Sequence, residues 1–250
     1  MESRKHWPQV VVRRALLVVP FCILFNALVN VLVALYEGGK LEWILNDQLG
    51  YNVHLAEVVS FSFISQIFLA FMYQLCLCAI RHLTWGFRWA CWVGWVYAFL
   101  RLLMVILFGV LSAIPLGENG AVTGSYQTLK NIIDWLDYIL CFTDSILICL
   151  LLLGLSELLP GEENRGFRRA LRIGWVVIIG LTDIGVIALG ALVLDFTGTS
   201  ALYRVLTFYH KYHNVAFTIP GFIAFFLLMI GARKLMGNSV LNPVGEVQGA

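Results

Sequence analysis

Hydrophobic positions along the chain form long apolar stretches, which short polar segments separate. Six of these stretches are long enough to cross a bilayer as helices, because a transmembrane helix needs roughly 20 residues. They lie at Ala15–Tyr36, Leu55–Ile80, Phe87–Ala113, Asn131–Ser156, Ala170–Leu194 and Asn214–Leu235. The pattern predicts an all-α, polytopic integral membrane protein. Residues 1–236 are expected to form a single domain of six transmembrane helices, and residues 237–250 a flexible cytoplasmic tail.

The composition agrees with lipid as the main solvent of this chain. Of its 250 residues, 60% are hydrophobic and 13% are charged, and the mean hydropathy is +0.84. A soluble domain carries about 25% charged residues. The lipid bilayer is therefore the first predicted partner.

Lys and Arg are unevenly divided between the two sets of connecting segments. The side that holds both termini carries Arg4, Lys5, Arg13, Arg14, Arg81, Arg88, Arg165, Arg168, Arg169, Arg172, Arg233 and Lys234. The other side carries Lys40, Lys130, Arg204 and Lys211. By the positive-inside rule both termini are cytoplasmic, and the cell membrane is the expected location. A net charge of +2 gives no indication of nucleic-acid binding.

One phrase occurs twice, 80 residues apart: GFRWACWVGWV at residues 86–96 and GFRRALRIGWV at residues 166–176. Each copy opens an expected span and repeats small residues every four positions, which places them on one helix face. Small residues let helix backbones approach closely in lipid. The predicted packing positions are Gly86, Ala90, Gly94, Gly166, Ala170 and Gly174. A duplicated helical hairpin explains the repetition; convergence of outward-running helices on the same residues is the alternative.

Charged and amide side chains at membrane depth are the candidate functional residues. Arg101 follows Arg88 by 13 residues, about 20 Å along a helix axis, and Asp183 follows Arg172 by 11, about 16 Å. A charge at the bilayer centre costs at least roughly 2.5–3.5 kcal/mol. Arg101 therefore needs an acidic partner, either Asp144 or Asp183.

Two further groups of polar side chains share helix faces at this depth. Asn26 and Asn30 lie together in the first span, and Asp137 and Asp144 in the fourth. A line of carboxylates that enters a membrane is typical of a cation or proton path. The expected ligand is a small cation, a proton or a polar solute. The competing interpretation is that these side chains only fix how the helices dock.

Histidines and cysteines give weaker indications. His54, His210 and His213 are weak candidates for a metal site, because all three fall at the expected outer interface, where histidine is ordinary. No metal and no cofactor are therefore predicted. The six cysteines, expected to be buried thiols that pack as small hydrophobic groups, are Cys22, Cys76, Cys78, Cys91, Cys141 and Cys149.

These observations favour a small membrane transporter, channel or solute-binding subunit with a polar site in the bundle centre. The alternative is a non-catalytic accessory or assembly subunit, whose small-residue ridges bind partner membrane helices or a second copy of the chain. A membrane-embedded enzyme is the third interpretation, but the sequence has no G-x-S-x-G, H-E-x-x-H or P-loop motif to support it.

Overall fold

A computed structural model describes residues 8–37, 55–114, 124–159, 161–178 and 220–236. Every regular element in these ranges is helical. The elements are α1 (Gln9–Glu37), α3 (Leu55–Ile80), α4 (Trp85–Ala113), α5 (Gly124–Leu158), the 3-10 turn η2 (Glu162–Asn164) and α6 (Arg165–Ile178). Another helix covers residues 220–236 and is called the C-terminal helix below. The all-α prediction is confirmed.

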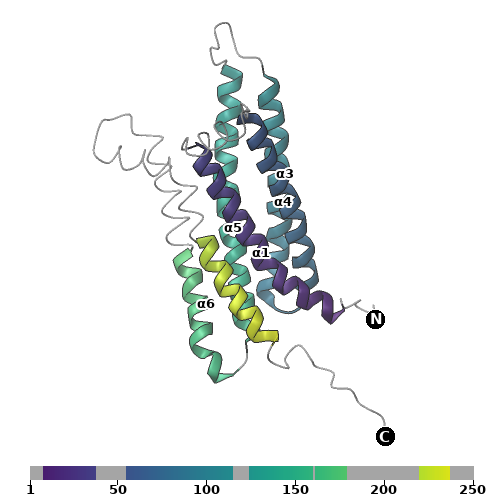
Figure 1. Ribbon diagram of the computed structural model, residues 1–250, viewed down its shortest axis with the longest axis vertical. Helices are drawn as coiled ribbons and strands as arrows, with labels where there is room; N and C mark the ends of the chain where they lie inside the picture. The colour runs from purple at the N-terminus through teal and green to yellow at the C-terminus, as the bar shows by residue number, and fades with distance from the viewer. Residues whose placement is uncertain (1–7, 38–54, 115–123, 160, 179–219, 237–250) are drawn as a thin grey trace, which may run out of the picture.

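The helices form an elongated bundle (Figure 1). α4 packs on both α3 and α5, α1 packs on α3, and α5 packs on α6. α3 and α4 are joined by a tight turn in which Thr84 caps α4: its Oγ1 accepts a hydrogen bond from the Phe87 N–H at 3.2 Å. Such a cap satisfies one of the N–H groups that lack a partner within the helix. α3 and α4 are therefore a defined antiparallel hairpin.

Glycines set the distance between α4 and its two neighbours. A Cβ on Gly86 would lie 2.5 Å from the Gly154 nitrogen and 2.8 Å from the Leu150 oxygen of α5. A Cβ on Gly94 would collide with the Gln74 Oε1 atom of α3. Ala90, between the two glycines, is fully buried. The first copy of the repeated phrase thus lies at close contacts on both sides of α4, with backbone atoms of α5 at Gly86 and with side chains of α3 at Gly94.

The second copy is placed differently. Gly166 and Ala170 are exposed, and a Cβ on Gly166 would meet no described atom within 4 Å. At Gly174 a Cβ would lie 3.2 Å from Leu227 Cδ1 of the C-terminal helix. No described helix lies against Gly166 or Ala170, so close packing at these two positions stays a prediction. The duplication itself remains a hypothesis.

The C-terminal helix is held against several helices. A Cβ on Gly221 would lie 3.1 Å from Ala27 Cβ of α1, and one on Gly231 would collide with Leu155 of α5. Lys234 Nζ donates a hydrogen bond to Asn164 Oδ1 at 3.2 Å and lies 5.1 Å from the Phe167 ring centroid. The chain end is thereby tied to the α5–α6 connection.

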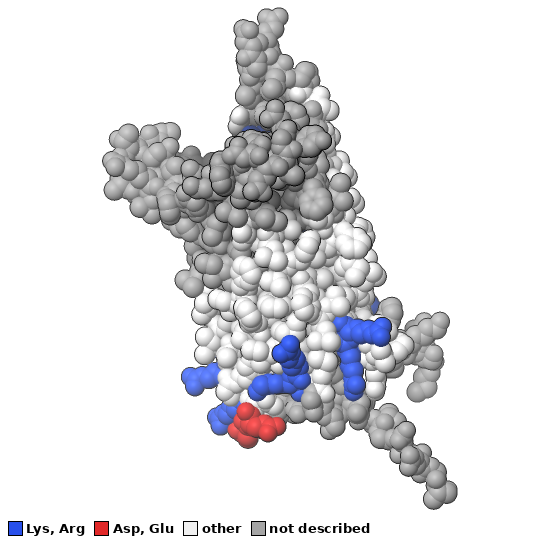
Figure 2. Space-filling model, in the orientation of Figure 1, with Lys and Arg blue, Asp and Glu red and all other residues white. Residues whose placement is uncertain are grey.

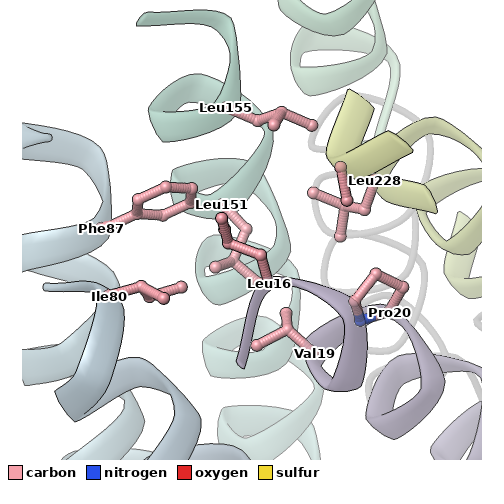
Figure 3. Close-up of a pocket in the computed structure, with 9 residues that line it drawn as sticks. Leu16, Val19, Pro20, Ile80, Phe87, Leu151, Leu155 and Leu228 are labelled. Carbon is pink, nitrogen blue, oxygen red and sulfur yellow. The ribbon is translucent and has the colours of Figure 1, made fainter. Parts of the chain in front are cut away.

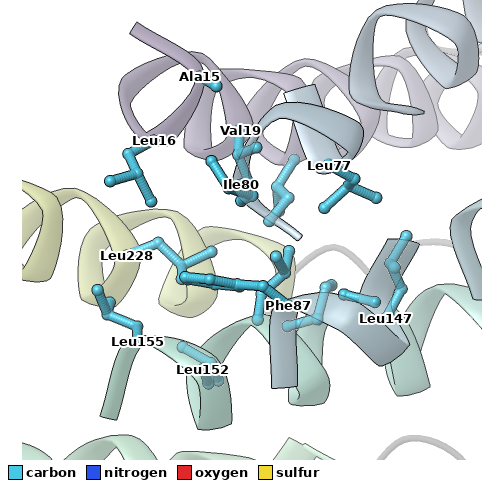
Figure 4. Close-up of a cluster of buried hydrophobic side chains, with 14 of the residues drawn as sticks. Ala15, Leu16, Val19, Leu77, Ile80, Phe87, Leu147, Leu152, Leu155 and Leu228 are labelled. Carbon is cyan, nitrogen blue, oxygen red and sulfur yellow. The ribbon is translucent and has the colours of Figure 1, made fainter. Parts of the chain in front are cut away.

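Two clusters of buried apolar side chains fill the bundle. The larger cluster joins α1, the α3–α4 hairpin, α5 and the C-terminal helix, with Phe87 and Leu155 among its most buried members (Figure 4). The smaller one contains Tyr97, Met104 and Leu111 of α4 with Leu136 and Leu140 of α5. Burial of apolar surface stabilises each cluster by about 25 cal/mol per Å².

Basic side chains gather at one end of the bundle, which is called the basic end (Figure 2). The start of α1, the α3–α4 turn, the α5–α6 connection and the end of the C-terminal helix meet there (Figure 1). Its exposed cations are Arg14, Arg81, Arg88, Arg165, Arg169, Arg172, Arg233 and Lys234.

Two helices are long and apolar enough to cross a membrane by length and composition: Gln9–Val29, with mean hydropathy 1.9, and Trp85–Leu111, with mean hydropathy 2.1. These two helices are weak evidence for association with a membrane, and they do not establish the six expected spans. The tail over residues 237–250 lies outside the described residues.

Candidate functional site

A hydrogen bond between α1 and α5 forms the centre of the candidate site. Asn26 Nδ2 donates to Asp144 Oδ2 at 3.3 Å. Asn26 is 7% exposed, and Asp144 is only partly exposed. The two residues are 118 positions apart in sequence, so this contact depends on the fold as a whole.

A guanidinium lies beside this pair. Arg101 Nε donates to Tyr97 Oη at 3.1 Å, and the Arg101 Cζ atom lies 5.2 Å from the Tyr97 ring centroid. These residues are four apart on α4, the spacing at which side chains on a helix meet. The Arg101 charge also lies within electrostatic range of the Asp144 carboxylate. Asp144 is one of the two expected partners of Arg101; Asp183, the residue expected at similar depth, lies outside the described residues.

Tyr73 of α3 completes the group. It is 4% exposed, and its hydroxyl lies within electrostatic range of Asp144 and Tyr97. Neither Tyr73 Oη nor Asn26 Oδ1 has a hydrogen-bond partner in the described part of the chain. Asn26, Tyr73, Tyr97, Arg101 and Asp144 are called the polar cluster below; they come from four helices.

The polar cluster lies where the two apolar clusters meet. On α5, Leu140 belongs to the smaller cluster and Leu147 to the larger one, with Asp144 between them. On α4, Cys91 belongs to the larger cluster, and Arg101 lies between Tyr97 and Met104 of the smaller one. Asp144 is 14 residues from the end of α5, or about 21 Å along the axis. Its charge is thus far from the basic end and surrounded by apolar packing.

The remaining predicted site residues are not placed. Asn30 and Asp137 lie in α1 and α5, but their side chains are outside the described part of the structure. Asp183, His54, His210 and His213 lie outside the described residues altogether. Within the described chain, no group of three or more His, Cys, Asp or Glu side chains is placed to hold a metal ion.

A small cavity lies nearer the basic end, between α1, α5 and the C-terminal helix (Figure 3). Its volume is about 10 Å³, and apolar side chains line it, among them Leu16, Pro20 and Leu228. This is about the space of one water molecule, but a buried water also needs two to four polar partners. The cavity is therefore a packing gap and not a solute site.

Tyr73 and Tyr97 are the members of the polar cluster that the sequence does not reveal. Tyrosine is common at membrane interfaces and in apolar cores, so its presence in a span marks no site. One signal was available for Tyr97, because it precedes the deep cation Arg101 by one helical turn.

The chain is thus an all-helical bundle with a buried polar cluster between two apolar clusters. In comparisons with known protein families, curated proteins and solved structures, nothing matches it.

Proposed function

We propose that this protein spans the membrane six times, with both termini on the cytoplasmic side of the plasma membrane, and carries a small cation or a proton through the polar cluster. The observation that carries the proposal is a pair of buried oxygen atoms beside the Asp144 carboxylate, Asn26 Oδ1 and Tyr73 Oη, which have no hydrogen-bond partner among the described residues. Native proteins leave few buried polar atoms unsatisfied, and those that remain often mark a water or an ion.

The chemistry of these atoms favours a cation over an anion. Asn26, Tyr73 and Asp144 present amide, phenol and carboxylate oxygens, and oxygen ligands suit hard cations. A hydronium ion or a proton on Asp144 is accommodated by the same acceptors. Zinc and copper prefer nitrogen or sulfur ligands, which the polar cluster does not contain.

Arg101 gives the site a means of releasing a bound cation. Its guanidinium stays charged at all physiological pH values, so it stabilises an ionised Asp144 when no cation is bound. An arriving cation must then compete with Arg101 for the same carboxylate. Conduction needs binding that is favourable enough for entry and weak enough for exit. The hydrogen bond to Tyr97 holds the guanidinium near the site in either state.

The arrangement of the helix ends supports the topology. A chain that places most of its cations at one end of a bundle follows the positive-inside rule, and all the described exposed Arg and Lys side chains except Lys130 lie there (Figure 2). The large apolar side chains on the outer face of α4, such as Trp92 and Phe99, are 66% and 64% exposed. Lipid is the solvent that suits such a face.

Flux through proteoliposomes tests the proposal. Purified protein is reconstituted with a trapped pH-sensitive dye, and proton and ²²Na⁺ uptake are measured under an imposed membrane potential. Asp144→Asn is expected to reduce uptake about tenfold or more, because the charge that attracts the ion is lost. Glu157→Gln removes an exposed acid from the same helix and should leave uptake unchanged. Full uptake by a folded Asp144→Asn protein would refute the proposal.

The second candidate function is an accessory subunit of a membrane complex. The outer face of α4 favours it, because Trp85, Trp89, Trp92 and Phe99 recur at helical spacing and are all about half exposed or more. A partner helix can cover such a face as well as lipid can. In that case the polar cluster only fixes how the helices dock. Absence of wild-type flux, together with a stable complex recovered with α4 at its contact, would favour this function.

A further inference from the structure

Two cysteines on neighbouring helices lie in contact near the basic end. Cys78 Sγ of α3 and Cys91 Sγ of α4 are 3.7 Å apart. Both are free thiols. Cys91 is 4% exposed, whereas Cys78 is partly exposed. Both were expected to pack as small hydrophobic groups, and the α3–α4 turn brings their sulfur atoms together.

A buried amide joins the pair. Gln74 Nε2 lies 3.7 Å from Cys78 Sγ and 3.6 Å from Cys91 Sγ, and it donates to the Cys91 carbonyl at 3.1 Å. Gln74 is 2% exposed, and its Oε1 has no hydrogen-bond partner in the described part of the chain. Arg81, at the adjacent turn, lies within electrostatic range of Cys91. The two sulfur atoms and the Gln74 amide nitrogen therefore form one close group between the facing sides of α3 and α4.

We propose that Cys78 and Cys91 are a modification site, at which a peroxide oxidises the two thiols to a disulfide that links α3 to α4. The sulfurs must approach from 3.7 Å to about 2.05 Å. Rotation of the two side chains is expected to supply this movement, because the sulfurs already touch. The proposal is independent of the transport function.

The order of the reaction follows from accessibility. The Cys78 thiolate attacks one peroxide oxygen; the O–O bond breaks, hydroxide leaves and takes up a proton, and Cys78 becomes a sulfenic acid. Cys91 sulfur then attacks Cys78 sulfur, the S–O bond breaks, and the oxygen leaves as water with the Cys91 proton. The two thiols are oxidised by two electrons and one peroxide is reduced to two waters. Burial disfavours a thiolate at Cys91, so this residue is the resolving cysteine.

The location of the Cys78–Cys91 pair suits a reversible oxidation. The pair lies near the basic end, which faces the cytoplasm in the proposed topology, and cytosolic disulfides are mostly transient and redox-sensing. The α3–α4 turn already restricts the separation of the two helices. A disulfide there adds a small constraint and is expected to change the local position of Gln74 more than the global fold.

Peptide mapping of the full chain in liposomes tests this site. The protein is treated briefly with hydrogen peroxide, alkylated, digested and analysed by mass spectrometry without reduction. A Cys78–Cys91 linked peptide, lighter by two hydrogens and split by dithiothreitol, is expected. Cys76→Ser is the matched control, because Cys76 precedes Cys78 on the same helix and should be dispensable for the link.

Single variants identify the order of the steps. Cys91→Ser should let a dimedone reagent trap the sulfenic acid on Cys78, whereas Cys78→Ser should abolish both the link and most dimedone labelling. Cys91→Ala serves if the serine variant does not fold. The proposal is overturned if folded wild-type protein gives a stable dimedone adduct at Cys78 with no linked peptide, or if Cys76 replaces Cys78 in the link.

Discussion

Gly86 of α4 and Gly154 of α5 lie so close that a Cβ on either one would overlap the other helix. From Gly86 the nearest atoms are backbone, at 2.5 and 2.7 Å, and from Gly154 they are Phe87 Cδ1 at 2.7 Å and Thr84 Oγ1 at 2.8 Å. In lipid, helices associate through such close approach. This contact places α4 against α5 near the basic end and so helps to fix the height at which Arg101 faces Asp144.

Replacing Gly86 with Ala is expected to lower the free energy of unfolding by about 1–3 kcal/mol, because backbone atoms cannot move aside as a side chain can. Thermal unfolding in detergent, followed by circular dichroism, measures the change. Gly109→Ala is the control on the same helix, since a Cβ there meets no described atom within 4 Å. That variant should be neutral or slightly stabilising. Equal midpoints for the two variants would show that the α4–α5 contact is looser than described.

The two tyrosines of the polar cluster should respond in opposite ways to loss of the hydroxyl. Tyr97→Phe removes the acceptor for Arg101 Nε and should cost about 1.5–3 kcal/mol, the range for hydrogen bonds to charged groups. Tyr73→Phe removes a buried hydroxyl that has no partner in the described chain, so stability should stay the same or rise. Unfolding curves of both variants give the comparison. In flux assays Tyr73→Phe should nevertheless lose activity, because its oxygen is proposed to contact the ion.

Arg101 and Asp144 should be energetically coupled. Arg101→Leu leaves the Asp144 carboxylate in an apolar environment without its nearby cation, which disfavours the charged form. Adding Asp144→Leu should recover part of the lost stability, with a coupling of about 0.5–3 kcal/mol, but should not recover flux. Four unfolding measurements complete the double-mutant cycle. Additive effects would mean that the electrostatic contact between the two residues is unimportant.

The two ends of α5 should lie on opposite sides of the membrane. α5 has 35 residues, or about 52 Å of helix, against a hydrocarbon core of about 30 Å. Gly124 and Glu163 are exposed positions near its two ends. In intact cells a membrane-impermeant maleimide should label Gly124→Cys and not Glu163→Cys, with the wild-type protein as background. The reverse pattern would invert the orientation, and labelling of both would exclude a spanning α5.

Hydropathy located the helices better than their ends. The expected span Leu55–Ile80 coincides with α3, whereas Asn131–Ser156 begins seven residues inside α5, which starts at Gly124. The first turns of α5 contain Ser125, Gln127 and Lys130, polar residues that suit water and still form helix. Apolar content marks the part of a helix that lipid or packing covers, so it cannot show where the helix itself begins.

Charged residues at membrane depth could be named from the sequence, but their contacts could not. Counting residues along each helix placed Arg101 near the depth of Asp183, and Asp144 was expected near the middle of its own span. The hydrogen bond between Asn26 and Asp144 depends on which helix faces meet, and one sequence does not specify this. For the same reason Gly154, which lies outside the repeated phrase, was missed as the partner of Gly86.

The gathering of cations at the basic end has a consequence for the lifetime of the molecule. To invert its orientation in a bilayer, the protein would have to move Arg81, Arg88, Arg172 and their exposed neighbours through the hydrocarbon core. The free-energy cost is roughly 2.5–3.5 kcal/mol or more for each charge. Thermal energy cannot supply that sum, so the orientation acquired at insertion is permanent. Copies that all insert by the positive-inside rule therefore point the same way, and in the proposed transport function an ion would approach the polar cluster through a different electrostatic field from each side. The proposed function thus predicts that inward and outward ion flux through such a uniformly oriented population need not have equal rates.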